Sequence, residues 1–531
     1  MLNATVAPRG LAVAPHSLAA QAALSILREG GNAIEAMVAA ASTIAVVYPH
    51  MNGIGGDGFW LVMPPDGEPV TIDASGPAGS LATLERYAGR ERIPFRGADA
   101  ALTVPGTVDG WRVALELAGE LAERPPLPLP RLLSDAIHYA SQGMPVTHSQ
   151  VAATRAKRSE LEHIPGFAES FLVDGRVPQE ASLFKQPKLA ATLSRLAASG
   201  LDDFYRGELA GSIAADIGRL GMPVTAADLA GYRARRGTPL KLAHSTGEIF
   251  NLAPPTQGLV SQMILGISDR LGLSTVEADS ADHIHALVEA TKRAFAVRDS
   301  QITDPACMRI DPQACLESAA LDREAAAVDM ARAAPWGEGK GPGDTIWMGV
   351  IDESGLAVSF IQSIYHEFGS GVVLPGSGIN WQNRGASFSL DPGHILALAP
   401  GKQPFHTLNP AAARLSDGRT LVYGTMGGDG QPQTQAAVYS RYAVFGQGLQ
   451  QAVSAPRWLL GRTWGDTSDS LKLESRFPQA VVEALAERGH EVELLAPFSE
   501  TMGHAGAVVR HPNGVLEGAF DPRSNGAAAG F

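Results

Sequence analysis

The sequence predicts a mixed α/β (α+β) protein in which a helix-rich part, residues 1–344, precedes a strand-rich part, residues 345–531. Apolar residues recur at helical spacing in several segments of the first part, among them residues 186–200, 207–221 and 281–300. A Gly/Pro-rich stretch then leads into two apolar segments joined by a short turn, a pattern typical of a β-hairpin. We therefore expect helices before this junction and mainly strands after it.

The first conspicuous motif is "GIGGDG", residues 53–58, which has the G-x-G-x-x-G spacing of a nucleotide-binding loop. That loop needs a strand before the glycines and a helix after them. Here the order is reversed. Asn32 and Glu35 form a capping box for an apolar helix over Ala33–Val47, and "FWLVM" after the glycines indicates a strand. The order helix, glycine turn, strand argues against a bound dinucleotide.

The next elements follow the same reasoning. The segment "PVTIDASGP", residues 69–77, is predicted to be a strand that runs into a turn, and the Pro-rich residues 123–133 a loop before a long helical region. Residues 250–259 indicate a strand end and a turn. Near the end of the chain we expect a helix over residues 478–488 and a strand at residues 491–496. No internal repeat or low-complexity tract is present.

The junction itself is unusual. Residues 334–344 are rich in Gly and Pro and are predicted to be an exposed linker, yet a buried strand begins immediately at Thr345. The ordinary explanation is a loop that precedes a strand. The chemical explanation is a nucleophile: a threonine at a chain terminus can use its own α-amine as the base that removes its hydroxyl proton. Such a terminus requires cleavage between Asp344 and Thr345.

Composition and charge exclude several classes of protein. The chain has 531 residues with 45% hydrophobic and 18% charged residues, which is ordinary for a globular protein. A net charge of −13 without a dense basic cluster argues against nucleic-acid and anionic-membrane partners. Cys307 and Cys315 form no disulfide framework, and His283 and His285 no metal-binding motif, so we expect core or surface histidines. Without a signal peptide or long apolar span, a cytoplasmic protein is expected.

Several separated motifs resemble the γ-glutamyltranspeptidase branch of the N-terminal-nucleophile hydrolases, and the resemblance extends over nearly the whole chain. Each motif is weak alone, but their order and spacing are specific. The resemblance implies a four-layer αββα sandwich in which both parts share one core, and glycines at residues 53–58 that serve a backbone turn. The motifs are "GGNAIEAMVAA", "YPHMNGIGGDGFW", "VPGTVDGW", "LDDFYRGELA", "PPTQGL", "GDTIWMGVID", "EFGSGVVLPGSGI", "PFHTLNP", "GTMGGDGQPQ" and "GAFDPRSNG".

The resemblance assigns roles to individual residues. Thr345 matches the family's processing and nucleophilic threonine, so that Asp344 and Thr345 flank the bond to be cut. Ser363 matches the hydroxyl residue that hydrogen-bonds the freed α-amine. Gly427 and Gly428 match the pair whose N–H groups stabilise the tetrahedral oxygen, although the alternative for this pair is a plain turn.

The substrate-binding positions depart from the γ-glutamyl pattern. Enzymes that act on γ-glutamyl compounds hold the α-carboxylate with an Arg near the "TID" strand, but no arginine stands around Asp73. The positions that would hold the amino group have also changed, as has the pair of serines that helps to bind the carboxylate. The residues now present are Tyr365 for Asn, Arg384 for Gln, Ser387 for Asp, and His406 and Thr407 for the two serines.

These changes predict a substrate with a carboxylate, an amide and no ammonium group. A site with an added arginine and a lost acid repels –NH3+, whereas the guanidinium of Arg384 matches a carboxylate bidentately. Tyr365, His406 and Thr407 could add neutral donors. The alternative is that Arg384 pairs with a surface carboxylate. The pattern "WQNRGASFSLDPG" is similar to the oxamate amidohydrolases of purine-ring catabolism, and oxamate is the smallest molecule that fits.

The best hypothesis is therefore a self-processing amidohydrolase that converts oxamate to oxalate and ammonia. The alternatives are a γ-glutamyl hydrolase or transpeptidase acting on glutathione-like compounds, a glutaryl-type acylase, and a non-catalytic binding scaffold. No metal or organic cofactor is required, and the expected partner is a small molecule. Self-cleavage would give a heterodimer of residues 1–344 and 345–531; whether two heterodimers associate stays open.

Overall fold

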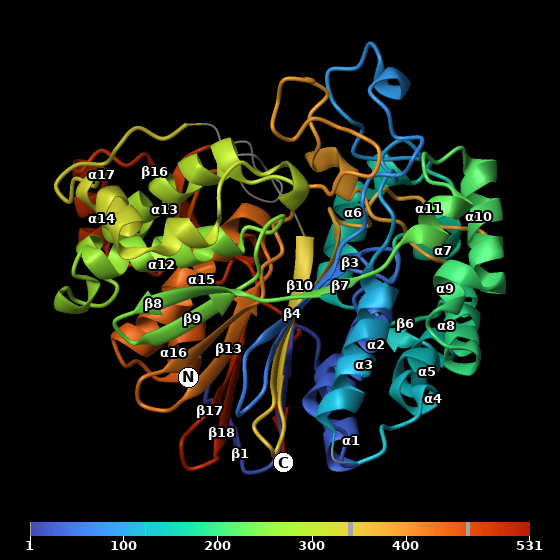
Figure 1. Cartoon of the computed structure of the whole chain (residues 1–531), viewed down its shortest axis with the longest axis horizontal. Coiled ribbons are helices and arrows are strands. Elements are labelled where there is room, and N and C mark those ends of the chain that lie inside the picture. Colours follow the sequence, from blue (N-terminus) through green and yellow to red (C-terminus); the bar gives the residue numbers. More distant parts are fainter. Residues whose placement is uncertain (1, 123, 338–343, 463–467) are drawn as a thin grey trace.

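The computed structural model describes residues 2–122, 124–337, 344–462 and 468–531, with the backbone alone for Asp344. Two β-sheets lie face to face in the centre of the molecule, and helices cover the outer face of each sheet (Figure 1). The predicted four-layer αββα sandwich is confirmed. The central strands are buried on both faces, which explains why they are continuous apolar runs in the sequence, whereas the strands at the sheet edges are partly exposed.

Both central sheets have seven strands in the described part of the chain, and all neighbouring strands are antiparallel. The first sheet runs in the order β1 (Thr5–Ala7), β18 (Leu516–Phe520), β17 (Ala505–Arg510), β13 (Thr420–Thr425), β12 (Ala411–Leu415), β9 (Gly247–Asn251) and β8 (Leu240–His244). The second runs β19 (Ala527–Gly530), β2 (Leu11–Ala14), β10 (Asp344–Ile351), β11 (Ala357–Tyr365), β3 (Asp57–Met63), β4 (Val70–Ala74) and β7 (Arg235–Gly237). Two small sheets contain β14 (Trp458–Leu460), β15 (Leu471–Glu474) and β16 (Val492–Leu495), and β5 (Met144–Pro145) with β6 (Leu183–Phe184).

The outer layers are helical. The first sheet is covered by α12 (Gly258–Arg270), α15 (Gln431–Tyr439) and α16 (Leu449–Ser454), and α13 (Ala281–Gln301) packs on α12 and α15 (Figure 1). The second sheet is covered by α1 (Ser17–Arg28), α2 (Ala33–Val47) and α3 (Thr107–Leu121), and α5 (Ser134–Gln142) packs on α2. The remaining helices are α4 (Leu129–Leu132), α6 (His148–Leu161), α7 (Phe167–Phe171), α8 (Pro187–Ser199), α9 (Asp203–Arg206), α10 (Glu208–Leu220), α11 (Ala226–Gly231), α14 (Ser318–Ala326) and α17 (Gln479–Glu487). The helix and strand expected near residues 478–496 are thus α17 and β16.

A separate apolar cluster fills the space between the sheets. Trp347 of β10 is buried there and donates its indole N–H to Ser359 Oγ at 2.9 Å. The ring needs two glycines in neighbouring strands, because a Cβ at Gly424 or Gly506 would lie 2.1 Å or 2.5 Å from it. Close packing of this kind fixes the spacing of the two sheets and therefore the position of β10.

The glycine segment is a backbone turn, as predicted. Helix α2 begins with the capping box that joins Asn32 to Glu35, and β3 follows the glycines. The turn presses against the second half of the chain: a Cβ at Gly55 would lie 2.2 Å from the Asn380 carbonyl oxygen, and one at Gly56 2.1 Å from that of Ser363. The glycines are needed for this close approach of backbones.

The two halves of the chain share one core. In the second sheet, β10 and β11 form the predicted antiparallel hairpin and lie between β2 and β3 from the first half. In the first sheet, β12 pairs with β9 of the first half, and β18 pairs with β1. The strands interleave, and neither half contains a complete sheet.

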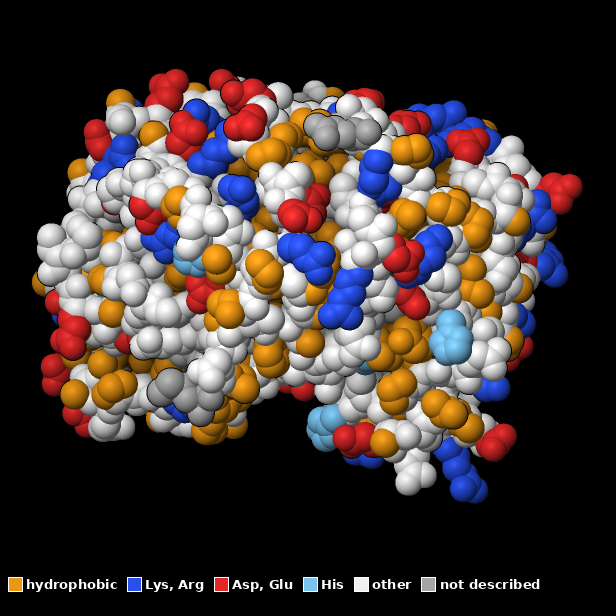
Figure 2. Space-filling model, turned by 90° about the horizontal axis from the view of Figure 1, so that it is seen from below, with side chains coloured by type: hydrophobic (Ala, Val, Ile, Leu, Met, Phe, Trp, Pro, Cys, Tyr) orange, Lys and Arg blue, Asp and Glu red, His pale blue; other side chains and the backbone are white. Residues whose placement is uncertain are grey.

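The predicted linker, residues 334–344, lies partly outside the described residues. On the face shown in Figure 2, acidic and basic side chains are interspersed. Both cysteines are free. Among the described helices, none combines the length and the apolar character needed to cross a bilayer.

Candidate active site

Thr345 is the second residue of β10 and is buried, with 1% of its surface exposed. Gln431, the first residue of α15, points its amide Nε2 at Thr345 Oγ1 across 3.4 Å. Thr345 therefore lies where the end of the second sheet meets the N-terminal end of a helix that covers the first sheet.

A β-bulge positions Ser363 beside this point. The register of the β10–β11 hairpin shifts between Asp344 and Ile346, so that Thr345 lies opposite two residues of β11, one of them Ser363. Ser363 is 1% exposed, and its Oγ accepts a hydrogen bond from the Tyr365 N–H at 2.7 Å. The bulge brings the predicted nucleophile and the predicted partner of its amine to the same place.

Gly427 and Gly428 connect β13 to α15. Their φ angles are 120° and 52°, a left-handed conformation that favours glycine. Gln257 fixes the backbone of this turn: its side-chain Nε2 donates to the carbonyl oxygens of Gly428 and Thr407, both at 2.8 Å. This bridge ties the predicted oxyanion glycines to a residue of the predicted substrate pocket.

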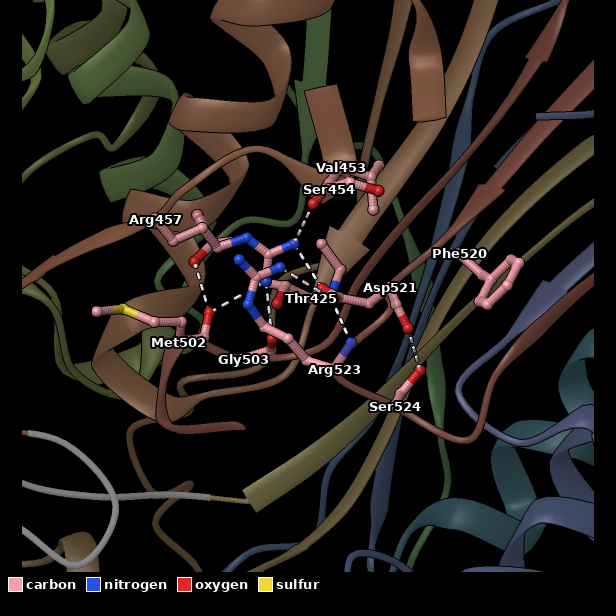
Figure 3. A network of polar contacts seen from close by, with 12 residues as sticks. Thr425, Val453, Ser454, Arg457, Met502, Gly503, Phe520, Asp521, Arg523 and Ser524 are labelled. Carbon is pink, nitrogen blue, oxygen red and sulfur yellow. Dashed lines mark hydrogen bonds and ion pairs between the residues drawn. The ribbon is translucent and has the colours of Figure 1, made fainter. Parts of the chain in front are cut away.

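A buried ionic network supports the same turn. Arg457 donates to the carbonyl oxygens of Met502 and Gly503 at 3.2 and 2.7 Å and forms an ion pair with Asp521 at 2.5 Å (Figure 3). Gly503 in turn packs on the oxyanion segment, since a Cβ on Gly427 would lie 3.6 Å from the Gly503 Cα. The network thus fixes the backbone against which Gly427 rests.

Arg384 begins the short 3-10 helix Arg384–Ser387 and is 1% exposed. Its guanidinium carbon lies 3.8 Å from the centre of the Tyr365 ring, and Nη1 contacts Thr407 Oγ1 at 3.5 Å. Within the described residues it forms no ion pair, and Nη2 has no hydrogen-bond partner. Burial lowers the pKa of Arg384 to about 10. The alternative of a surface ion pair is therefore wrong.

Tyr365 has the strained backbone that this stacking requires. Its φ of 81° is rare for a residue with a side chain, and such strain concentrates at functional sites. Tyr365, Thr407 and Ser387 line a cavity of 200 Å³. The Ser387 hydroxyl donates to the Arg384 carbonyl oxygen at 3.0 Å. The two side chains that touch the guanidinium thus open onto a cavity of small-molecule size.

His406 is fully buried beside these residues. Its ring packs edge-on against Phe59 at 4.9 Å, and neither ring nitrogen has a hydrogen-bond partner among the described residues. Burial, and next the charge of Arg384, hold the pKa of His406 well below its usual range. Nε2 lies 3.5 Å from the Asp57 carboxylate.

Asp57 was not predicted as a site residue from the sequence. It follows the glycines of the "GIGGDG" segment, where the only signal was an acid inside an otherwise apolar, buried motif. Gln431 and Gln257 were missed as well: both lie inside the motifs "GTMGGDGQPQ" and "PPTQGL", but nothing local shows that their side chains contact the site. At Asp73 the carboxylate accepts hydrogen bonds from Ser75 and Gln403, and Arg235 lies opposite Asp73 on the neighbouring strand β7.

One histidine cluster lies outside this site. Ligand atoms of His285, Glu289 and His490 lie within 4.8 Å of one another. All three side chains already have partners: His285 Nδ1 and His490 Nε2 lie 2.8 Å apart, and Glu289 forms an ion pair with Lys292 at 2.7 Å. The adjacent ammonium group opposes a cation, so these residues are hydrogen-bonded core residues.

The model of the family described as "Gamma-glutamyltranspeptidase" matches residues 19–531. The chain belongs to this family. An oxamate amidohydrolase proenzyme of Klebsiella pneumoniae subsp. pneumoniae is 65% identical, with 100% of both chains covered. A glutathione hydrolase-like proenzyme of Bacillus subtilis is 38% identical over 100% of both chains. The crystal structure of cephalosporin acylase from Bacillus halodurans superposes with a TM-score of 0.90 at 33% identity, covering 100% of this chain and 97% of that one.

Membership of the γ-glutamyltranspeptidase family defines the class of the protein. It is a hydrolase with the αββα fold of the N-terminal-nucleophile enzymes, and the similarity to solved structures extends over the full chain. The resemblance inferred from the motifs is thereby confirmed, including the similarity to oxamate amidohydrolases.

Proposed function

We propose that this γ-glutamyltranspeptidase-family hydrolase cleaves itself between Asp344 and Thr345 and then hydrolyses oxamate to oxalate and ammonia. The observation that carries the proposal is Arg384: a fully buried guanidinium without an anionic partner in the described residues, next to a cavity of 200 Å³. A buried cation of this kind is costly unless an anion joins it. The 65% identity to an oxamate amidohydrolase proenzyme supports the same substrate.

The proposed reaction has two halves. The freed α-amine of Thr345, held by Ser363, removes the hydroxyl proton, and Oγ attacks the amide carbon of oxamate. The N–H groups of Gly427 and Gly428 receive the negative oxygen of the tetrahedral intermediate. The protonated amine then passes its proton to the leaving nitrogen, which departs as ammonia. Water attacks the remaining oxalyl ester with the same amine as base, which releases oxalate and restores Thr345.

Arg384 orients the substrate in this scheme. Oxamate joins its carboxylate directly to its amide, so that a carboxylate held by Arg384 and Thr407 fixes the reactive carbon beside Thr345. Positioning of this kind can contribute a large part of the rate enhancement. His406 and Tyr365 complete the pocket, and Ser387, at its wall, replaces the acid that an ammonium group would need.

The fragments of the proposed cleavage are residues 1–344 and 345–531, which stay together because their strands interleave in both sheets. We propose a heterodimer with a small-molecule substrate, present in the cytoplasm and active in purine catabolism. A dimer of such heterodimers is a further proposal. A denaturing gel with N-terminal sequencing tests the cleavage: a smaller fragment that starts at Thr345 is expected, and an active preparation that stays intact would contradict it.

A second candidate is hydrolysis of γ-glutamyl compounds, favoured by the 38% identity to a glutathione hydrolase-like proenzyme. A glutaryl-type acylase is favoured by the structural similarity to a cephalosporin acylase. Ammonia release from oxamate is compared with release of p-nitroaniline from a γ-glutamyl anilide and of the amine from a glutaryl amide. Turnover of oxamate alone is the expected result, and faster turnover of either other substrate would overturn the assignment.

A further inference from the structure

Asp57 and His406 are two fully buried polar residues that face each other behind the proposed substrate pocket. Asp57 Oδ2 and His406 Nε2 lie 3.5 Å apart, and neither atom has a hydrogen-bond partner among the described residues. His406 Nδ1 is also without a partner there. Buried polar atoms almost always have a hydrogen-bond partner. Three neighbouring buried atoms without one among the described residues therefore indicate a site where a bound group supplies the partner.

The orientation of the Asp57 carboxyl group is fixed. Oδ1 accepts three hydrogen bonds, from the N–H groups of Gly76 and Gly106 at 3.1 Å each and from Gln382 Nε2 at 3.0 Å. The carboxyl group therefore turns Oδ2, and with it any proton it carries, toward His406. A ring nitrogen faced by this oxygen is either the donor or the acceptor of a single shared proton.

The position of that proton decides whether His406 Nδ1 is a hydrogen-bond donor or an acceptor toward a bound substrate. When the Asp57–His406 pair holds the extra proton, the pair is neutral overall and Nδ1 carries a hydrogen that can donate to a carboxylate. When the extra proton is absent, Asp57 is an anion, Nε2 carries the hydrogen, and Nδ1 presents a lone pair. The first state binds an anion, whereas the second repels one.

The charged and titratable groups around the pair favour the uptake and release of a proton. Arg384 is the cation that acts on both Asp57 and His406, and Asp57 is the acid that acts on Arg384. Tyr205 and Tyr232 face Asp57 from the first half of the chain, and burial raises the pKa of both well above the usual range, which keeps them neutral. Burial raises the pKa of Asp57 to about 7. The pair therefore changes its charge near neutral pH as one coupled unit.

We propose that the Asp57–His406 pair takes up one proton when the substrate carboxylate binds, so that His406 Nδ1–H becomes the second donor of the anion clamp beside Arg384. The inference rests on the proposed function. In the empty site the negative charge of the Asp57 carboxylate acts on Arg384 from beyond ion-pair distance; in the occupied site the substrate carboxylate pairs with Arg384 directly, and Asp57 becomes neutral. The buried charge is the same in both states, which avoids the large cost of an unpaired buried ion. Asp57 acts through His406 and is a positioning residue.

The Asp57→Asn variant separates this role from a structural one. The Asn amide keeps the oxygen that accepts three hydrogen bonds and puts a permanent N–H donor where Oδ2 was, which mimics the protonated pair. In the wild-type enzyme, KM for oxamate should rise about tenfold per pH unit above the pKa of the pair. In Asp57→Asn, KM should stay level across the same pH range.

Proton uptake gives a measurement that does not need the variant or turnover. Oxalate binding to the processed wild-type enzyme is measured by calorimetry in buffers with different ionisation enthalpies, at a pH about one unit above the pKa of the pair, where the empty pair is mostly unprotonated; uptake approaching one proton is expected. The inference would be overturned if oxalate binding took up no proton. It would also be overturned if KM of Asp57→Asn rose with pH as steeply as KM of the wild-type enzyme. If oxamate releases no ammonia at any pH, the proposed function fails, while uptake on oxalate binding still supports the clamp.

Asp352→Asn is the matched control. Asp352 is also a buried acid whose pKa is raised by burial, and it accepts hydrogen bonds from backbone N–H groups. It lies in the turn of the β10–β11 hairpin, at the other end of these strands from Thr345. The substitution should lower stability but leave the dependence of KM on pH unchanged. A flattened profile in this variant as well would show that a loss of stability alone removes the pH dependence.

Discussion

Replacement of Arg384 by Gln should abolish most turnover of oxamate without harming the fold. The loss of one partner from a desolvated, charge-assisted pair costs about 2–5 kcal/mol, which corresponds to a fall in kcat/KM of about 30-fold to about 5,000-fold. Self-cleavage should proceed normally, because Thr345, Ser363 and the two oxyanion glycines are untouched.

The effect on stability should have the opposite sign. Burial lowers the pKa of Arg384 from its usual value to about 10, so its charged form costs about 3 kcal/mol in the folded state. Because the folded-state pKa lies below the unfolded value, this cost is fully present at neutral pH, begins to shrink as the pH rises through about 10, and is gone only above the unfolded-state pKa. The contact with the Tyr365 ring returns about 0.5–2 kcal/mol. Arg384→Gln should therefore melt at the same or a higher temperature.

The assay combines ammonia release with a thermal melt. Arg441→Gln is the matched control, since Arg441 is equally buried but pairs with Asp279 at 2.6 Å. This control should lose about 3–5 kcal/mol of stability and keep its activity per folded molecule. Arg384→Lys should recover only part of the activity, because it lacks the bidentate fork. Undiminished turnover of oxamate by Arg384→Gln, or a loss of activity that accompanies a lower melting temperature, would refute the reasoning.

Three further substitutions test other parts of the site. Thr345→Ala should leave the chain whole on a denaturing gel and inactive; release of a smaller fragment would contradict self-processing by Thr345. Gly427→Ala forces a side chain into φ 120°, and the displaced N–H should lower kcat about 10²–10³-fold, with little change in KM for oxamate in steady-state assays. Arg457→Met removes a cation that pairs with Asp521 (Figure 3). It should cost about 3–5 kcal/mol in a urea titration, and an unchanged midpoint would show that the network is dispensable.

Local patterns were sufficient for many elements of the fold. The capping box and apolar run predicted α2 to the residue, because both signals act within a few turns of one helix. The hairpin of β10 and β11 followed from two apolar runs and a turn. The four-layer arrangement was not visible in these patterns. It came from the resemblance of dispersed motifs, since the pairing of β10 with β2 and of β18 with β1 joins segments hundreds of residues apart.

The site was predictable only in part. Motifs pointed to Thr345, Ser363, Gly427 and Gly428 as the proposed catalytic residues, and charge arguments to Arg384 as the proposed determinant of specificity. Nothing in the sequence distinguished Arg384 from an arginine in a surface ion pair, because the outcome depends on which distant side chains surround it.

The sequence by itself was enough to predict the chemistry: a nucleophilic threonine directly after a Gly/Pro-rich linker, a glycine pair proposed to stabilise an oxyanion, and an arginine at a position where the family resemblance places the ligands of an ammonium group. Tertiary structure alone decided that Arg384 is buried without a carboxylate partner among the described residues, that a bulge brings Ser363 to Thr345, and that Asp57 faces His406 across 3.5 Å. Desolvation and pairing set the charge and proton state of such groups, and both depend on neighbours that the folded chain brings together from remote segments.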